Sequence, residues 1–209
     1  MYPAKKNQPL IIAGPSGDLE CLLSIPKNNH RKTIAIICHP HPLHGGSMRN
    51  KVIHTLDKAL GQLGLVTIRF NFRGVGKSAG LYDEAKGEVD DLKAVIDWAQ
   101  NEMPEQELCL AGFSFGAYIA MKASLDVSCK QLITVAPPVN IFDFTPLQAP
   151  TCPWLLIQGM QDEIVDANEV MEWASQFSKV SIVREPDSGH FFHGKLNTLQ
   201  SIIDEYYEK

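Results

Sequence analysis

Residues 108–123 constrain the fold of this chain more than any other stretch. Residues 108–111 form an apolar run without polar alternation, which predicts a strand buried on both faces. The run leads into Gly112-Phe113-Ser114-Phe115-Gly116 and then into residues 117–123, which are rich in helix formers. Serine between two glycines on a strand-to-helix turn is the pattern of a nucleophile elbow. The segment therefore predicts a strained, exposed serine near the positive end of a helix.

The rest of the chain alternates predicted strands with predicted helices, which indicates a mostly parallel sheet covered by helices on both faces. An opening antiparallel hairpin is expected at one edge of the sheet, and residues 1–209 are expected to form a single α/β domain. Strands are predicted at 10–13, 19–25, 33–38, 65–70, 108–111, 132–136, 154–158 and 180–184, and helices at 50–63, 84–100, 117–123, 168–177 and 196–207.

Composition narrows the class of partner. The net charge of -5 and the lack of a basic stripe argue against nucleic acid. No apolar stretch approaches the ~18 residues that a membrane span needs, and residues 10–13 are too short for a signal-peptide core. The five cysteines are an odd number without a C-x-x-C pair, so free thiols in a reducing compartment are expected. A cytoplasmic protein is predicted.

A nucleophilic serine needs a base and an acid, and in an open α/β sheet these come from loops at the carboxyl ends of strands. Asp162 follows the strand predicted at 154–158, and His190 follows the strand predicted at 180–184. Asp143 is an alternative acid and His193 an alternative base. Capping of the next helix is an alternative role for Asp162, but Asp166 is better placed for that role.

Two other patterns suggest ligands and are weaker. His39, His41 and His44 invite a metal hypothesis, but no H-E-x-x-H pattern or cysteine pair accompanies them. Gly76-Lys77-Ser78 resembles the end of a phosphate-binding loop, but that loop would need glycine where Asn71 stands. We therefore expect neither a metal nor a cofactor. Arg73, before this motif, is expected to hydrogen-bond loop carbonyls.

Five sequence blocks occur together in a characteristic order. They are residues 39–46 (HPHPLHGG), 71–78 (NFRGVGKS), the elbow at 112–116, 159–162 (GMQD) and 188–192 (SGHFF). With them the chain resembles the α/β-hydrolase superfamily, close to small bacterial members that lack a lid and carry an H-P-H-P-x-x-G-G motif. The resemblance implies a catalytic triad of Ser114, Asp162 and His190. It also implies an oxyanion hole formed by the backbone N–H groups of Phe115 and His41.

The connector at 139–151 is too short to hold a lid, so an open pocket is expected. Its predicted apolar walls are Leu43, Phe113, Phe142 and Phe144. The resulting hypothesis is a serine hydrolase, foremost a carboxylesterase, with thioesterase or small prolyl-type peptidase activity as alternatives. The substrate would be a small ester, a thioester or a short peptide.

Two hypotheses of other kinds remain. A hydrolase-shaped binding protein without catalysis would have lost a triad residue, and none is lost here. A dienelactone-hydrolase-like enzyme usually carries cysteine at the elbow, where this chain has Ser114. An unpaired sheet edge and the apolar residues of the last helix permit a homodimer without requiring one.

Overall fold

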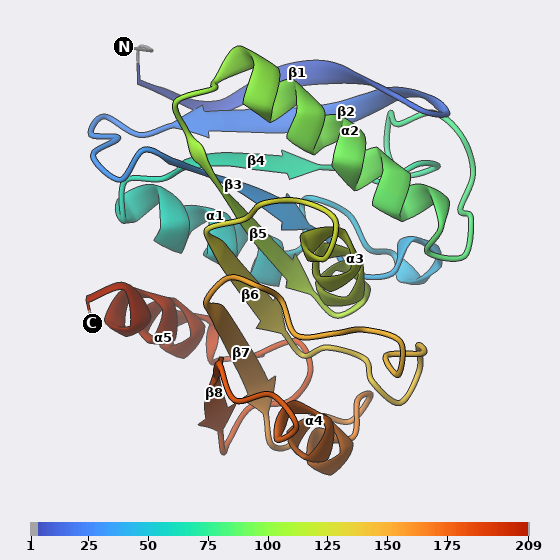
Figure 1. The fold of residues 1–209 in the computed structure, drawn as a ribbon, viewed down its shortest axis with the longest axis vertical. Helices are drawn as coiled ribbons and strands as arrows, with labels where there is room; N and C mark the ends of the chain where they lie inside the picture. Colours follow the sequence, from blue (N-terminus) through green and yellow to red (C-terminus); the bar gives the residue numbers. More distant parts are fainter. Residues whose placement is uncertain (1–3, 209) are drawn as a thin grey trace.

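The computed structural model describes residues 4–208 and contains an eight-stranded sheet (Figure 1). The strands lie in the spatial order β1-β2-β4-β3-β5-β6-β7-β8. Their bounds are β1 Lys5–Gly14, β2 Gly17–Ile25, β3 Thr33–Cys38, β4 Val66–Phe70, β5 Glu107–Phe113, β6 Gln131–Val135, β7 Trp154–Gly159 and β8 Val180–Glu185.

Strand direction divides the sheet into two parts. From β4 to β8 every neighbouring pair is parallel, whereas β1 and β2 form an antiparallel hairpin that joins β4 in antiparallel fashion. This confirms the predicted α/β-hydrolase fold with its antiparallel opening hairpin at one edge. Because the six parallel strands all end at the same side, the loops that follow them gather there.

Helices cover both faces of the sheet (Figure 1). Helices α2, α3 and α4 pack on one face, where their apolar residues share a core with alternate strand residues such as Ile36. Helices α1 and α5 pack on the other face, which receives the intervening residues such as Ile37. Their bounds are α1 Lys51–Gln62, α2 Gly87–Glu102, α3 Phe115–Ser124, α4 Ala167–Ala174 and α5 Leu196–Glu208. The central strands are buried throughout, which explains why their sequences are continuously apolar.

Several predicted boundaries differ from the structure, and two of the differences have a clear physical cause. Strand β1 begins at Lys5 rather than at residue 10, because backbone pairing with β2 extends an edge strand through exposed polar residues. Helix α2 begins at Gly87 rather than at residue 84, since Glu84 and Ala85 have positive φ values of 49° and 67°. A β-carbon at Gly87 would lie 1.8 Å from Arg73 Nη1, so glycine at the start of α2 makes room for this guanidinium.

Arg73 does not bind loop carbonyls as expected. Its guanidinium forms a two-pronged ion pair with the buried Asp91 of α2, with a shortest distance of 2.8 Å from Nη2 to Oδ1. The same carboxylate accepts a hydrogen bond from the Arg73 backbone N–H at 2.9 Å. The glycine-rich loop after β4 is thus anchored to α2, and it has a structural role.

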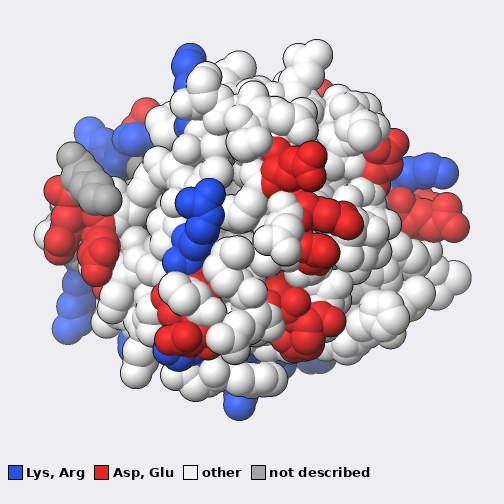
Figure 2. Space-filling view, turned by 90° about the horizontal axis from the view of Figure 1, so that it is seen from below, with Lys and Arg blue, Asp and Glu red and all other residues white. Residues whose placement is uncertain are grey.

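The surface near α4 carries acidic side chains in several groups, with scattered lysine and arginine side chains between them (Figure 2). The side of the molecule seen in that view therefore presents no continuous positive band. No helix within residues 4–208 combines the length and apolar character needed to cross a membrane.

Candidate active site

Ser114 sits on the turn between β5 and α3 in a strained backbone conformation, with φ 54° and ψ -122°. Only glycine fits on either side of this turn. A β-carbon at Gly112 would lie 2.1 Å from the backbone oxygen of Gly116, and one at Gly116 would lie 2.1 Å from that of Cys38. The tight turn holds the Ser114 hydroxyl at the carboxyl end of the sheet, as the elbow pattern predicts.

Three side chains from separate loops form a hydrogen-bonded chain. His190 Nε2 lies 3.1 Å from Ser114 Oγ, and His190 Nδ1 lies 2.8 Å from Asp162 Oδ2. The imidazole and the carboxylate are buried, with exposed side-chain fractions of 2% and 0%. The structure thus brings together the serine, histidine and aspartate that the sequence analysis selected, although they are far apart in the chain.

The Asp162 carboxylate is held in its charged form. Burial raises its pKa, but the hydrogen bonds from His190 and from the backbone N–H groups of Val165 and Ile164 outweigh this, and the pKa is lowered. Those N–H groups donate to Oδ1 at 2.7 and 2.9 Å, whereas Oδ2 is bonded to the imidazole and also accepts a hydrogen bond from Gln158 Nε2 at 3.1 Å. Asp162 does not cap α4. Asp166 does, since its side chain accepts hydrogen bonds from the first turn of that helix.

The alternative acid and base lie elsewhere. Asp143 is exposed and its Oδ1 accepts a hydrogen bond from the backbone N–H of Thr145 at 3.0 Å, within its own loop. The His193 ring contacts Phe191, with ring centroids 5.7 Å apart. Neither residue is hydrogen-bonded to Ser114 or to His190 within residues 4–208.

Sequence reasoning missed a third carboxylate in this region. Glu163 Oε2 accepts a hydrogen bond from the backbone N–H of His190 at 3.1 Å. A β-carbon at Gly189 would lie 2.6 Å from the same oxygen, so the glycine permits the contact. Glu163 therefore fixes the backbone of the histidine loop from outside. The adjacency of Asp162 and Glu163 was the available signal, but it does not reveal the direction of the second side chain.

The loop after β3 lies opposite the elbow. Within it, a β-carbon at Gly46 would lie 1.9 Å from Pro40 O, and the Gly46 N–H donates to His41 O at 3.0 Å. The backbone N–H groups of His41 and Phe115 donate to no acceptor within residues 4–208, and both residues line the cavity beside Ser114. Two free donors therefore border the nucleophile.

His39 is a structural histidine. It is fully buried, with Nδ1 2.6 Å from Pro40 O and Nε2 accepting a hydrogen bond from the Phe72 N–H at 3.0 Å. Both ring nitrogens are therefore occupied, so His39 is not available as a metal ligand in this conformation. The described residues contain no group of three or more metal-ligating side chains.

The cavity beside Ser114 has a volume of about 400 Å³ and differs from the predicted one. Phe142 lines it as expected, but three of the predicted walls do not. Leu43 is 69% exposed to solvent, Phe113 is buried behind the His190 ring at 5.0 Å between centroids, and Phe144 packs against Trp173. The residues that do line it are Pro40, His41, His44, Gly45, Gly46, Asn50, Ser114, Phe115, Pro138, Ile141, Phe142, Ile164, His190 and Phe191.

Local backbone geometry explains why Phe115 lines the cavity and Phe113 does not. Phe113 is the last residue of β5 and points to the face covered by α1 and α5, whereas Phe115 opens α3 on the other side of the elbow. Ile141, Ile164 and Phe191 come from three loops that meet only in the folded chain.

Comparison with known proteins agrees with this geometry. Residues 31–149 match the family model described as serine aminopeptidase, S33. A solved α/β serine hydrolase homologue from Coxiella burnetii is 48% identical, with a TM-score of 0.92 and coverage of 97% of this chain and 98% of that one. A serine hydrolase without a lid from Xanthomonas campestris is 41% identical, with a TM-score of 0.93 and coverage of 98% and 94%.

A relative of unknown role from Rickettsia prowazekii is 35% identical over 92% of this chain and 85% of its own length. The family match spans more than half of the chain, and the solved structures extend the likeness over nearly all of it. The chain therefore belongs to the α/β-hydrolase superfamily, as one of its serine hydrolases without a lid.

Proposed function

We propose that this protein hydrolyses carboxylic esters through Ser114, His190 and Asp162. His190 Nε2 takes the hydroxyl proton as Ser114 Oγ attacks the ester carbonyl, and it later returns a proton to the leaving alcohol. Asp162 holds the imidazole by Nδ1 and stabilises the imidazolium that forms. Water then attacks the acyl-enzyme with His190 again as base. The observation that carries the proposal is the unbroken hydrogen-bonded chain of 3.1 and 2.8 Å behind the strained serine.

The free N–H groups of His41 and Phe115 support an acyl-transfer reaction. A tetrahedral intermediate places negative charge on the former carbonyl oxygen, and backbone donors aimed at that oxygen lower the barrier by about 3 kcal/mol each. The His41 donor belongs to the loop that His39 and Gly46 hold in place. This loop is thereby organised before substrate arrives.

The cavity supports a neutral substrate. Its lining contains no Asp, Glu, Lys or Arg, and its walls on one side are Ile141, Phe142, Ile164 and Phe191. An aminopeptidase substrate carries an ammonium group, which loses free energy on burial unless a carboxylate pairs with it. The Asp162 carboxylate is already bound by His190. Neutral esters with small apolar groups fit this lining better than peptides do.

Labelling with a fluorophosphonate probe tests the proposal. Wild-type protein should be labelled, whereas Ser114→Ala and His190→Ala should not be, with circular dichroism confirming that both variants are folded. A panel of p-nitrophenyl esters, thioesters and aminoacyl amides then ranks the substrates, and esters should be turned over fastest. Absence of labelling in folded wild type would contradict the proposal and favour a binding protein of hydrolase shape. Preference for aminoacyl amides would contradict the ester assignment alone.

A further inference from the structure

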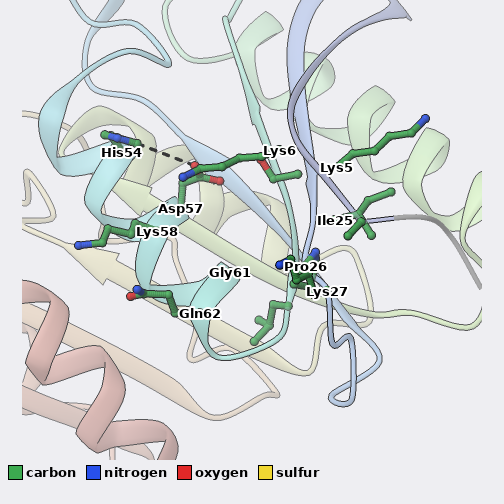
Figure 3. Close-up of a pocket in the computed structure, with 13 residues that line it drawn as sticks. Lys5, Lys6, Ile25, Pro26, Lys27, His54, Asp57, Lys58, Gly61 and Gln62 are labelled. Atoms are coloured by element: carbon green, nitrogen blue, oxygen red, sulfur yellow. Dashed lines mark ion pairs between the residues drawn. The ribbon is translucent and has the colours of Figure 1, made fainter.

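A cavity of about 570 Å³ lies away from Ser114, between the start of β1, the end of β2 and helix α1 (Figure 3). It borders the amino end of β4, because Ser24 of β2 pairs with Thr67 there. Ser114 instead follows the carboxyl end of β5. The two sites are therefore at opposite ends of the parallel strands, and the mechanism proposed above makes no use of this one. Its volume is within the range of small-molecule sites.

Positive charge gathers at this cavity, although the chain as a whole has a net charge of -5. Lys6, Lys27 and Lys58 line it, and within residues 4–208 no carboxylate lies within ion-pair distance of these three. Lys5 also lines the cavity, but in Figure 3 its side chain points away from α1, and the Lys58 side chain points away from β1. An uncompensated group of cations beside a cavity favours an anionic ligand.

The single acidic residue of the lining does not neutralise them. Asp57 is buried, and its carboxylate forms an ion pair with Arg69 at 3.2 Å and accepts a hydrogen bond from Thr67 Oγ1. Its charge is balanced beneath the cavity. His54 lies 3.9 Å from the same carboxylate, on the exposed side of α1 (Figure 3).

A β-bulge directs Lys6 toward the cavity. Lys5 pairs with Ile25 and Gln8 pairs with Leu23, so Lys6 and Asn7 together face one residue of β2. Asn7 has a positive φ of 50° and is held there because its Oδ1 accepts a hydrogen bond from Arg69 Nη2 at 2.7 Å. In Figure 3 the Lys6 side chain extends from β1 toward α1. A buried arginine thus maintains a local strain that places a lysine on the rim.

The apolar part of the cavity includes Ile25, Pro26 and Leu65. Gly61 borders open space at the cavity, because a β-carbon there would have no neighbour within 4 Å. Gly61 has an ordinary helical conformation and no close backbone contact that would require glycine. Glycine is less favourable than alanine within a helix, so its presence here leaves space at a cost to α1.

From these observations we propose that the cavity binds a small molecule with a phosphate monoester group and an apolar body. A phosphate monoester carries close to two negative charges at neutral pH and suits several separate ammonium groups, whereas a carboxylate carries one. Lys6 approaches the phosphate from β1, and Lys27 lies beside it on the segment that follows β2. The apolar body lies against Ile25 and Leu65 in the space over Gly61.

The test is a titration of the ¹⁵N-labelled full chain with phenyl phosphate, followed by NMR. Saturable shifts of the Lys6, Lys27 and Gly61 amides are expected, with inorganic phosphate binding more weakly because it lacks the apolar body. Vesicles containing phosphatidylglycerol are a separate arm for a lipid source of the phosphate. Binding to vesicles without a saturable response to phenyl phosphate would overturn the proposal and indicate a membrane surface.

Matched variants locate the site. Replacing Lys6 and Lys27 by Gln should weaken phenyl phosphate binding roughly two- to fivefold per lysine. Gly61→Leu should abolish binding while the remaining spectrum stays that of the folded protein. Lys93→Gln is the control, since Lys93 is paired with Asp126 at 2.7 Å elsewhere. Unchanged affinity in both the lysine variant and Gly61→Leu would contradict the proposal. Ester hydrolysis should be the same in all of them.

Discussion

The His39 imidazole accepts a hydrogen bond from the backbone N–H of Phe72 at 3.0 Å, which ties the loop after β3 to the loop after β4. Nε2 is the acceptor, so the proton of the neutral ring is on Nδ1, which donates to Pro40 O. Burial lowers the pKa of His39 to about 4, and the Pro40 hydrogen bond only partly opposes this effect. The bond that organises the loop around His41 therefore requires a neutral His39.

This relationship predicts a pH dependence of stability. Because the pKa of His39 is lower in the folded chain than in the unfolded chain, unfolding takes up a proton between about pH 6.5 and pH 4. As the pH is lowered through that window, this residue should reduce the free energy of unfolding by on the order of 3 kcal/mol. Urea unfolding of wild type and His39→Asn at several pH values measures it. The variant should be less stable at pH 7 and less sensitive to acid, and parallel pH profiles would contradict the assignment.

The strained serine predicts a stability difference between two inactive variants. Ser114 has φ 54° and ψ -122°, a conformation that glycine adopts more readily than residues with a β-carbon. The free energy of unfolding of Ser114→Gly should therefore exceed that of Ser114→Ala by about 1 kcal/mol, which gives a higher urea midpoint, although both variants lose the nucleophile. Alanine is the matched control because it keeps the β-carbon and removes only the hydroxyl. Equal midpoints would show that the elbow stores no strain.

Glu163 predicts a positioning effect on catalysis. Its carboxylate holds the His190 backbone N–H at 3.1 Å, so Glu163→Ala frees the histidine loop without touching the reacting atoms. The rate of fluorophosphonate labelling should fall about tenfold, since a small displacement of the base is costly. Glu163→Gln retains an acceptor oxygen and should react close to the wild-type rate. Glu172→Ala, on α4, is the surface control.

The labelling rate distinguishes a positioning role of Glu163 from a purely structural one. If Glu163→Ala unfolds earlier but is labelled at the wild-type rate, the contact is merely structural. If alanine and glutamine behave alike, the accepted hydrogen bond is not the relevant feature.

Cys129 and Cys152 predict a response to oxidants. Their Sγ atoms lie 2.9 Å apart just before β6 and β7, and both are free thiols. Hydrogen peroxide should join them, with both thiol hydrogens removed and the peroxide reduced to water. The disulfide would close the loop from Cys129 to Cys152, which includes Phe142, and should raise the free energy of unfolding by about 3 kcal/mol. Mass spectrometry after trypsin digestion detects the linked peptides, and Cys129→Ser should abolish them. Cys38→Ser is the control, because Cys38 is buried elsewhere in the core.

Local sequence determined the central part of the molecule. Gly112, Ser114 and Gly116 mark the elbow in the sequence, because a β-carbon at Gly112 would collide with the backbone of Gly116 within the same turn. The buried strands are equally local, since continuous apolar runs have no other stable place in this fold. Chain order then directed Asp162 and His190 to the same edge of the sheet as Ser114, because parallel strands all end there.

The pocket and the carboxylates around it depended on tertiary structure. Phe113 and Phe115 are indistinguishable in the sequence, yet one lies behind His190 and the other beside the cavity, because a strand ends and a helix begins between them. Arg73 pairs with Asp91, and Glu163 accepts a hydrogen bond from the His190 backbone, because of side-chain directions that residue spacing does not predict. The lysine cavity likewise arises from a β-bulge and a helix far apart in the chain. Backbone sterics act between neighbours and are legible in a sequence, whereas the lining of a cavity is set by loops that meet only when the chain has folded.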